Sequence, residues 1–189
     1  MLHKDRDYIA CQGPLERTSE DFWDMILQYQ VLKIVMLTKT HERDPDDPQE
    51  LVNDEQHNVT HFYFTGWPDY NVIEPERFLD LIDQVNHTEN SPSDLHKSDQ
   101  NQTSPPIVVH CSAGVGRTGT YIALDVLMSL LGCPNSDLST IELDVMGTVY
   151  QLRLSRNKMV QTKEQYLLLY RCVKKQLKRT KQLNTAHVK

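Results

Sequence analysis

The chain has 189 residues, of which 39% are hydrophobic and 24% charged, and this composition predicts one globular domain long enough to bury a core. Its formal net charge of −6 argues against nucleic acid as the main partner. Because the sequence has no apolar run of about 18 residues and no signal-like start, we expect neither a membrane span nor secretion.

The first half of the chain predicts alternating helices and strands. Apolar residues at helical spacing indicate a helix over residues 19–30, and a β-branched run indicates a buried strand over residues 31–38. Residues 59–65 alternate as a half-buried strand does. Pro75 then marks the start of another helix, because proline is well tolerated at the first helical position.

The second half continues the alternation. Residues 86–106 are rich in Ser, Asn and Asp without periodicity, which predicts a flexible surface loop. A strand follows over residues 107–110. Apolar spacing then predicts three helices: residues 118–131, 141–152 and 162–177. Strands alternating with helices predict an α/β fold, with the ligand site at the carboxyl end of a strand.

Residues 107–120 carry the strongest functional signal. A β-branched run delivers Cys111 into a loop of small residues, and Arg117 follows as a helix begins. Gly114 and Gly116 let backbone N–H groups turn toward an anion, to which the helix N-terminus adds its positive dipole end. The planar fork of Arg117 suits two phosphate oxygens, and the same positive field favours a thiolate. The pattern indicates a nucleophilic cysteine beneath a bound phosphate.

The full string from His110 to Gly119, HCSAGVGRTG, resembles the signature of the tyrosine-specific protein phosphatases. The resemblance implies a central mixed, twisted sheet flanked by helices, with a phosphate-binding loop between a strand and a helix N-terminus. It further implies that Cys111 attacks phosphotyrosine and forms a phosphocysteine, that Thr118 helps the thiolate leave, and that His110 orients and stabilises the thiolate from behind. The residues expected to bind the phosphate are Ser112, Ala113, Gly114, Val115, Gly116 and Arg117. No metal or organic cofactor is implied.

Residues 65–72 resemble the mobile Trp-Pro-Asp loop of the same family. There the aspartate, here Asp69, protonates the leaving phenolate, and a positioned acid contributes about 10²–10⁴ in rate. We expect Trp67 to contribute to substrate binding. Taken alone, the tripeptide is more often a turn anchored by an aromatic side chain.

Residues 159–166 are similar to the glutamine loop of the family, in which Gln161 and Gln165 would place the hydrolytic water. The alternative for Gln165 is structural, because Thr162 and Gln165 have the spacing of a helix capping box. Upstream, Arg153 and Arg156 match the arginine pair that braces the phosphate loop.

The four cysteines, at positions 11, 111, 133 and 172, form neither a metal-ligand pattern nor a disulfide framework. Because exposed thiolates oxidise, we expect a reducing, cytoplasmic location, which includes the intracellular part of a receptor. The expected partners are phosphotyrosine-containing proteins. Basic residues gather between positions 171 and 181, and two interpretations stay open: a solvated helix face, or a docking site for a membrane or an acidic partner.

Several features depart from the family pattern. The sequence before Tyr8 lacks the Asn-Arg-Tyr recognition loop, and an acidic stretch over residues 42–55 stands where the family has a Lys-Cys-x-x-Tyr-Trp hairpin segment. Asn71 and Ile73 replace the usual Gly and Pro of the Trp-Pro-Asp loop, which predicts slower loop closure. We therefore expect a shortened catalytic domain over residues 1–180 and a basic flexible tail over residues 181–189.

These departures leave three functions open. The first is a protein-tyrosine phosphatase, which the catalytic residues favour. The second is a truncated or impaired relative that binds phosphotyrosine without turnover. The third is a dual-specificity or phosphoinositide phosphatase with a shallower pocket, against which the Trp-Pro-Asp and Gln-Thr-x-x-Gln-Tyr elements argue.

Overall fold

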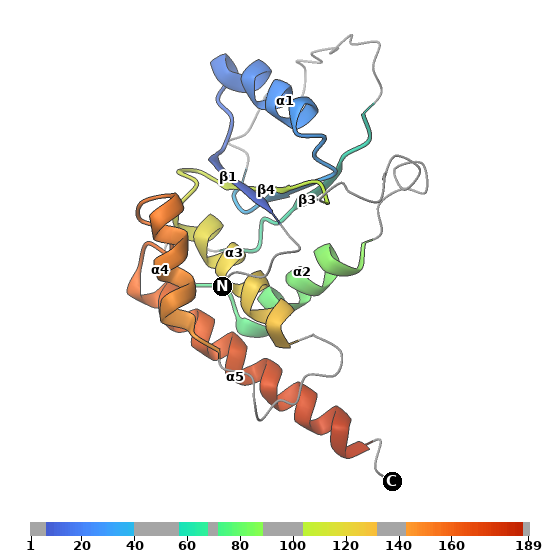
Figure 1. The fold of residues 1–189 in the computed structure, drawn as a ribbon, viewed down its shortest axis with the longest axis vertical. Coiled ribbons are helices and arrows are strands. Elements are labelled where there is room, and N and C mark those ends of the chain that lie inside the picture. Colours follow the sequence, from blue (N-terminus) through green and yellow to red (C-terminus); the bar gives the residue numbers. More distant parts are fainter. Residues whose placement is uncertain (1–6, 40–56, 68–71, 89–103, 132–142, 187–189) are drawn as a thin grey trace.

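The computed structural model describes residues 7–39, 57–67, 72–88, 104–131 and 143–186 (Figure 1). Its centre is a sheet of four short strands in the order β1-β4-β2-β3. The strands are β1 (Tyr8–Gln12), β2 (Lys33–Met36), β3 (Thr60–Tyr63) and β4 (Ile107–Cys111). The strand that ends on Cys111 therefore lies in the interior of the sheet, paired with β1 on one side and β2 on the other.

All pairings among these four strands are parallel, where the resemblance had led us to expect a mixed sheet. The reason is the connectivity. Helix α1 (Ser19–Gln28) lies between β1 and β2, and α2 (Pro75–His87) lies between β3 and β4. Such crossovers return the chain to the edge where the previous strand began. The α/β class itself is confirmed, and the carboxyl ends of the strands share one edge.

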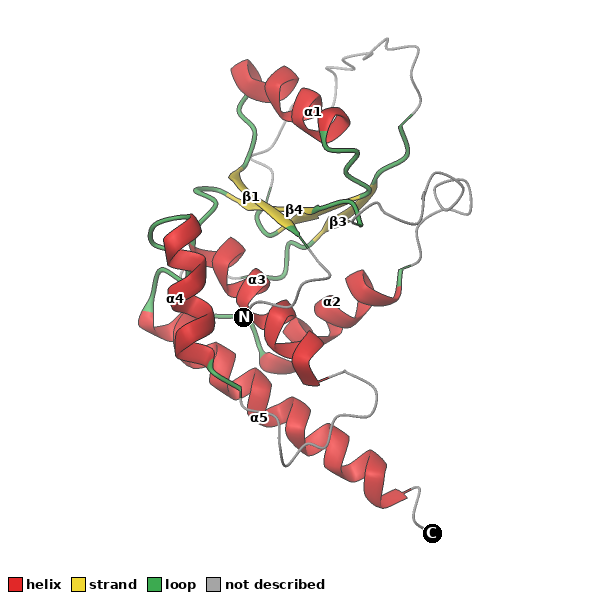
Figure 2. Cartoon of the chain, in the orientation of Figure 1, coloured by secondary structure: helices red, strands yellow, loops and turns green. Residues whose placement is uncertain are grey.

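The helices form two unequal layers (Figures 1 and 2). Helix α1, preceded by the 3₁₀ turn η1 (Glu16–Thr18), covers one face of the sheet. The other face carries α2, α3 (Gly116–Leu131), α4 (Val145–Ser155) and α5 (Lys163–Ala186). The larger hydrophobic cluster lies on this second side, and a small cluster around Ile26 and Ile34 lies beneath α1.

The predicted elements lie where the sequence placed them, with shifted ends. Pro75 occupies the first turn of α2, as expected, and its ring fits there without loss of a helical hydrogen bond. Helix α3 begins at Gly116, two residues before the predicted start. The largest difference is α5, which continues to Ala186 although we expected a helix end at 177 and a flexible tail from 181. The predicted acidic stretch and most of the loop over residues 86–106 lie outside the described residues.

A buried carboxylate joins three of these elements. Asp125 of α3 is fully buried, and its oxygens accept hydrogen bonds from the Tyr8 hydroxyl at 2.7 Å and from the Asn86 amide at 2.9 Å. Buried charge is tolerated when hydrogen bonds satisfy it. The network ties β1 and α2 to the helix that starts at the phosphate loop.

Candidate active site

The predicted phosphate loop connects the end of β4 to the first turn of α3. Every residue of β4 is buried, and Cys111 is only 5% exposed. Gly114 has a φ of +70°, a left-handed conformation that glycine adopts without strain. A Cβ atom at this position would also collide with the Cys11 carbonyl oxygen of β1. Glycine is therefore required both for the turn and for the close approach to the neighbouring strand.

Thr118 lies in contact with the predicted nucleophile. Its hydroxyl donates a hydrogen bond to Cys111 Sγ at 3.2 Å, and both side chains are buried. A donor at this position stabilises sulfur as it carries negative charge. The structure thus brings together the two residues that the sequence placed seven positions apart, on either side of the loop.

The end of β2 also organises the loop, which the sequence did not reveal. The Leu37 carbonyl accepts a hydrogen bond from Arg117 Nη1 at 3.1 Å, and the Leu37 N–H donates to the His110 carbonyl at 2.9 Å. Next to it, the Thr38 hydroxyl lies 3.3 Å from the Ser112 hydroxyl. The pairing of β2 with β4 could have predicted these contacts, because the residues that follow neighbouring parallel strands meet at the same edge of the sheet.

His110 faces away from the sulfur. Successive residues of a strand point to opposite faces, so His110 lies beneath α1 while Cys111 lies on the α3 side. The imidazole packs edge-on against Phe22 with a centroid distance of 5.7 Å, and its Nδ1 has no hydrogen-bond partner among the residues that the structure describes. Burial lowers the pKa of His110 from its usual 6.5, opposed in part by a backbone hydrogen bond at Cys111. The imidazole packs beside the small hydrophobic cluster under α1. Because its ring lies on the opposite face of the sheet from Cys111 Sγ, His110 can affect the thiolate through the β4 backbone and not by direct contact.

Of the two arginines predicted to brace the phosphate loop, Arg156 contacts the loop itself and Arg153 contacts the segment after α4. Arg156 Nε donates to the Gly114 carbonyl at 2.9 Å, and its Nη2 donates to the Ala113 carbonyl at 3.3 Å. Because these carbonyls point toward Arg156, the loop N–H groups are left to face an anion. Arg153 donates to the carbonyls of Met159 and Val160 at 2.9 and 2.8 Å, and so fixes the segment that leads to Gln161.

That segment contains a strained backbone. Val160 is buried with a φ of +57°, a conformation that is rare for a β-branched residue. Its N–H donates to the Val115 carbonyl of the phosphate loop at 3.1 Å. A Cβ atom on Gly119 would lie 2.6 Å from the Val160 nitrogen, so α3 and this segment are in van der Waals contact. Strain of this kind persists where the surroundings enforce it.

Both predicted water-placing glutamines lie against the loop. A Cβ atom on Gly116 would lie 3.1 Å from Gln165 Nε2 and 3.2 Å from Gln161 Oε1. The side-chain Oε1 of Gln165 accepts from the backbone N–H groups of Gln161 and Thr162, while the backbone N–H of Gln165 donates to the Thr162 hydroxyl. The capping box is therefore present, and the amide nitrogen of the same side chain lies toward the loop.

Trp67 lies in the hydrophobic core. It is 2% exposed and packs edge-to-face on Phe78 of α2 with a centroid distance of 5.0 Å. Ile73, on the far side of the Trp-Pro-Asp segment, is also 2% exposed. Trp67 is thus placed to anchor the segment rather than to contact a substrate. Asp69 and Asn71 lie outside the described residues.

The other two described cysteines, Cys11 and Cys172, lie in surroundings that disfavour a thiolate. Burial raises the pKa of Cys11 to about 11 and that of Cys172 to about 12, so both are protonated at neutral pH. All three described cysteines are free. Among the described residues, no group of three or more His, Cys, Asp or Glu side chains is suited to hold a metal ion.

Comparison with known proteins agrees with this arrangement. The sequence profile of the protein-tyrosine phosphatase family matches residues 1–51 and 46–175. The chain is 39% identical to chicken (Gallus gallus) receptor-type tyrosine-protein phosphatase eta over 88% of its own length and 13% of that protein. It is 35% identical to the human tyrosine-protein phosphatase non-receptor type 7 over 88% of its length and 51% of that protein. The chain therefore belongs to the protein-tyrosine phosphatase family.

The coverage of these relatives is unequal. Human receptor-type tyrosine-protein phosphatase C, at 35% identity, matches over 89% of this chain but 14% of its own length. The chain thus spans between about an eighth and a half of the relatives it matches. In the part of the chain that the structure describes, no helix has the length and apolar character needed to cross a membrane.

Proposed function

We propose that the chain hydrolyses phosphotyrosine in proteins through a phosphocysteine intermediate on Cys111. The observation that carries this proposal is the hydrogen bond from Thr118 to Cys111 Sγ at the floor of a braced anion loop. A buried thiol held at the end of a strand, before the N-terminus of α3, is suited to nucleophilic attack on a bound oxyanion. Family membership supports the same conclusion.

In the first proposed step, the Cys111 thiolate attacks phosphorus in line with the leaving group. The S–P bond forms and the bond from phosphorus to the tyrosine oxygen breaks, while Asp69 donates a proton to that oxygen. Arg117 and the loop N–H groups hold the three equatorial oxygens. Most of the rate gain in phosphoryl transfer comes from such positioning and charge stabilisation.

In the second step, water attacks the phosphocysteine. Gln161 and Gln165 lie against the loop at Gly116, which supports their proposed role in placing this water. Asp69 now takes a proton from the water, the P–O bond to phosphate forms, and the S–P bond breaks. The Thr118 hydroxyl stabilises the departing thiolate, because it already donates to the sulfur. No step requires a metal or an organic cofactor.

We further propose that residues 1–180 form the catalytic unit and that it works in the cytoplasm, either as a free protein or as the intracellular part of a receptor. A thiolate nucleophile requires a reducing compartment. The relatives include proteins named as receptor-type and as non-receptor phosphatases, and both are compatible with this location. The expected partners are phosphotyrosine-containing proteins.

The test is turnover of a phosphotyrosyl peptide, with a phosphoseryl peptide as the specificity control. We expect selective hydrolysis of the phosphotyrosyl peptide, abolished by Cys111→Ser and reduced about 10²-fold or more by Asp69→Ala. Asp83→Ala, on an exposed position of α2, is the matched control and should retain full activity. A folded chain that binds the peptide without turnover would instead be a phosphotyrosine-binding relative.

A further inference from the structure

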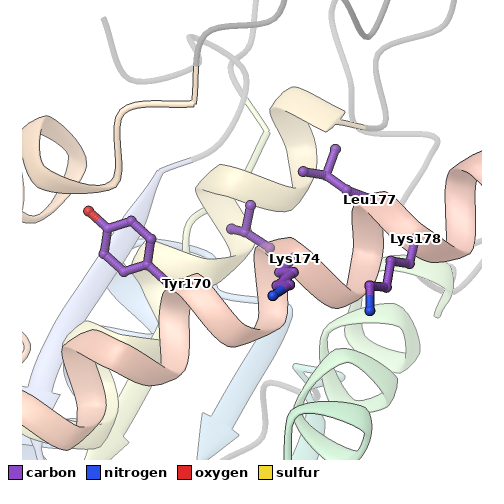
Figure 3. A pocket seen from close by; sticks show the side chains of 5 residues that line it. Tyr170, Lys174, Leu177 and Lys178 are labelled. Atoms are coloured by element: carbon purple, nitrogen blue, oxygen red, sulfur yellow. The ribbon is translucent and has the colours of Figure 1, made fainter.

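The middle of α5 carries a hollow of about 430 Å³, which we call the α5 hollow. The described residues that line it are Tyr170, Val173, Lys174, Leu177 and Lys178 (Figure 3). Val173 is buried and Leu177 is half-buried, so the hollow has an apolar floor. Gln165, in the first turn of α5, lies against the phosphate loop. Lys174 is nine residues later, which corresponds to about 14 Å along the helix axis. The hollow is therefore separate from the candidate active site.

The charges on this part of α5 divide into two groups. Lys175 forms an ion pair with Glu76, and Arg179 pairs with Asp80 at 3.5 Å, so both cations are balanced by α2. Arg171, Lys174 and Lys178 are exposed and have no acidic partner among the described residues, and the two lysines line the hollow. Like charges four positions apart destabilise a helix. Two uncompensated lysines beside an apolar floor therefore indicate a surface suited to a negatively charged partner.

We propose that the α5 hollow docks an acidic amphipathic helix of another protein. One apolar side chain of that helix would cover Val173 and Leu177, and two carboxylates four residues apart would pair with Lys174 and Lys178. The match is geometric, because residues four apart lie about 6 Å from each other on the same helix face in both partners. Helix-in-groove docking of this kind uses apolar anchors flanked by charges.

The charge distribution favours a peptide over a lipid surface. Binding to an anionic bilayer draws on a cluster of four to eight uncompensated cations. On α5, Lys175 and Arg179 are paired with carboxylates of α2, so Arg171, Lys174 and Lys178 are the three uncompensated cations among the described side chains of residues 171–180. A local pair of lysines beside a concave apolar site is better matched by a pair of carboxylates on one helix.

The experiment measures binding of a fluorescent helical peptide to the full chain by anisotropy. The probe carries glutamates four residues apart and leucines on the adjoining face, and its control has glutamine at each glutamate position. We expect saturable binding of the acidic probe that weakens as ionic strength rises, and about tenfold weaker binding of the glutamine control. Lys174→Glu/Lys178→Glu should weaken binding of the acidic probe by about tenfold or more. Leu177→Gln should weaken binding of both peptides.

The matched control variant is Arg17→Glu/Lys163→Glu, which makes the same change in net charge at exposed positions outside the hollow. It should bind the acidic probe within about twofold of the unmodified chain. The proposal is overturned by any of three results: no saturable binding, equal loss in the two double variants, or binding only to phosphatidylserine vesicles. Circular dichroism of each variant confirms that the exposed substitutions leave the chain folded.

Discussion

Replacing Thr118 by valine keeps the shape of a fully buried side chain and removes the hydroxyl that donates to Cys111 Sγ. A hydrogen bond to a charged group contributes about 1.5–3 kcal/mol. Both partners are buried, so solvent does not diminish this value. The hydrogen bond stabilises Cys111 most when the thiolate departs from phosphorus. Its loss therefore corresponds to roughly a 10- to 150-fold decrease in the rate constant for hydrolysis of the phosphocysteine.

We therefore expect Thr118→Val to lower kcat by this amount and to show a burst of phenolic product, because the phosphocysteine forms faster than it is hydrolysed. The assay is stopped-flow detection of a chromogenic aryl phosphate. Thr120→Val is the matched control: its hydroxyl is equally buried on the same helix but donates to the Gly116 carbonyl at 2.7 Å. Unchanged kcat in Thr118→Val, or an equal loss in Thr120→Val, would refute this reasoning.

Three further predictions follow from the same geometry. Arg156→Ala removes the donor to the Gly114 carbonyl, so we expect inhibition by vanadate to weaken about tenfold, with an unchanged inhibition constant as the opposing result. Trp67→Ala leaves a cavity beside Phe78 and should cost about 3–5 kcal/mol, lowering Tm by roughly 6–20 °C in calorimetry. Burial lowers the pKa of His110, so the unfolded chain takes up this proton first as the pH falls. Stability should therefore decrease below about pH 6.5, and His110→Asn should flatten the dependence of Tm on pH; parallel curves would exclude this contribution.

The sequence predicted the elements around the phosphate loop because their signals are local. The β-branched run of β4 and the small residues after Cys111 identify a strand, a turn and a helix start without further context. The Thr162–Gln165 spacing identified the start of α5 for the same reason. The end of α5 was misjudged, since its apolar periodicity fades after Leu177 although the helix continues to Ala186.

Features that depend on distant contacts were not predictable in this way. The contact of Thr38 with Ser112 joins residues 74 positions apart and arises only when β2 and β4 pair. The positive φ of Val160 contradicts the preference of a β-branched side chain and is held by packing against α3. The Trp-Pro-Asp motif led us to expect that Trp67 contacts the substrate. In the structure its side chain is buried in the hydrophobic core, which a short sequence motif does not reveal.

The central claim is that Cys111 carries the phosphoryl group during turnover. Rapid acid quenching of the chain with a phosphotyrosyl peptide, followed by mass spectrometry of the digest, tests it directly. We expect phosphate on the peptide that contains Cys111, more of it in Thr118→Val, and none in Cys111→Ser. Hydrolysis without phosphate on that peptide in both the unmodified chain and Thr118→Val would contradict the proposed mechanism, and tight binding without phosphate transfer would identify a binding protein instead.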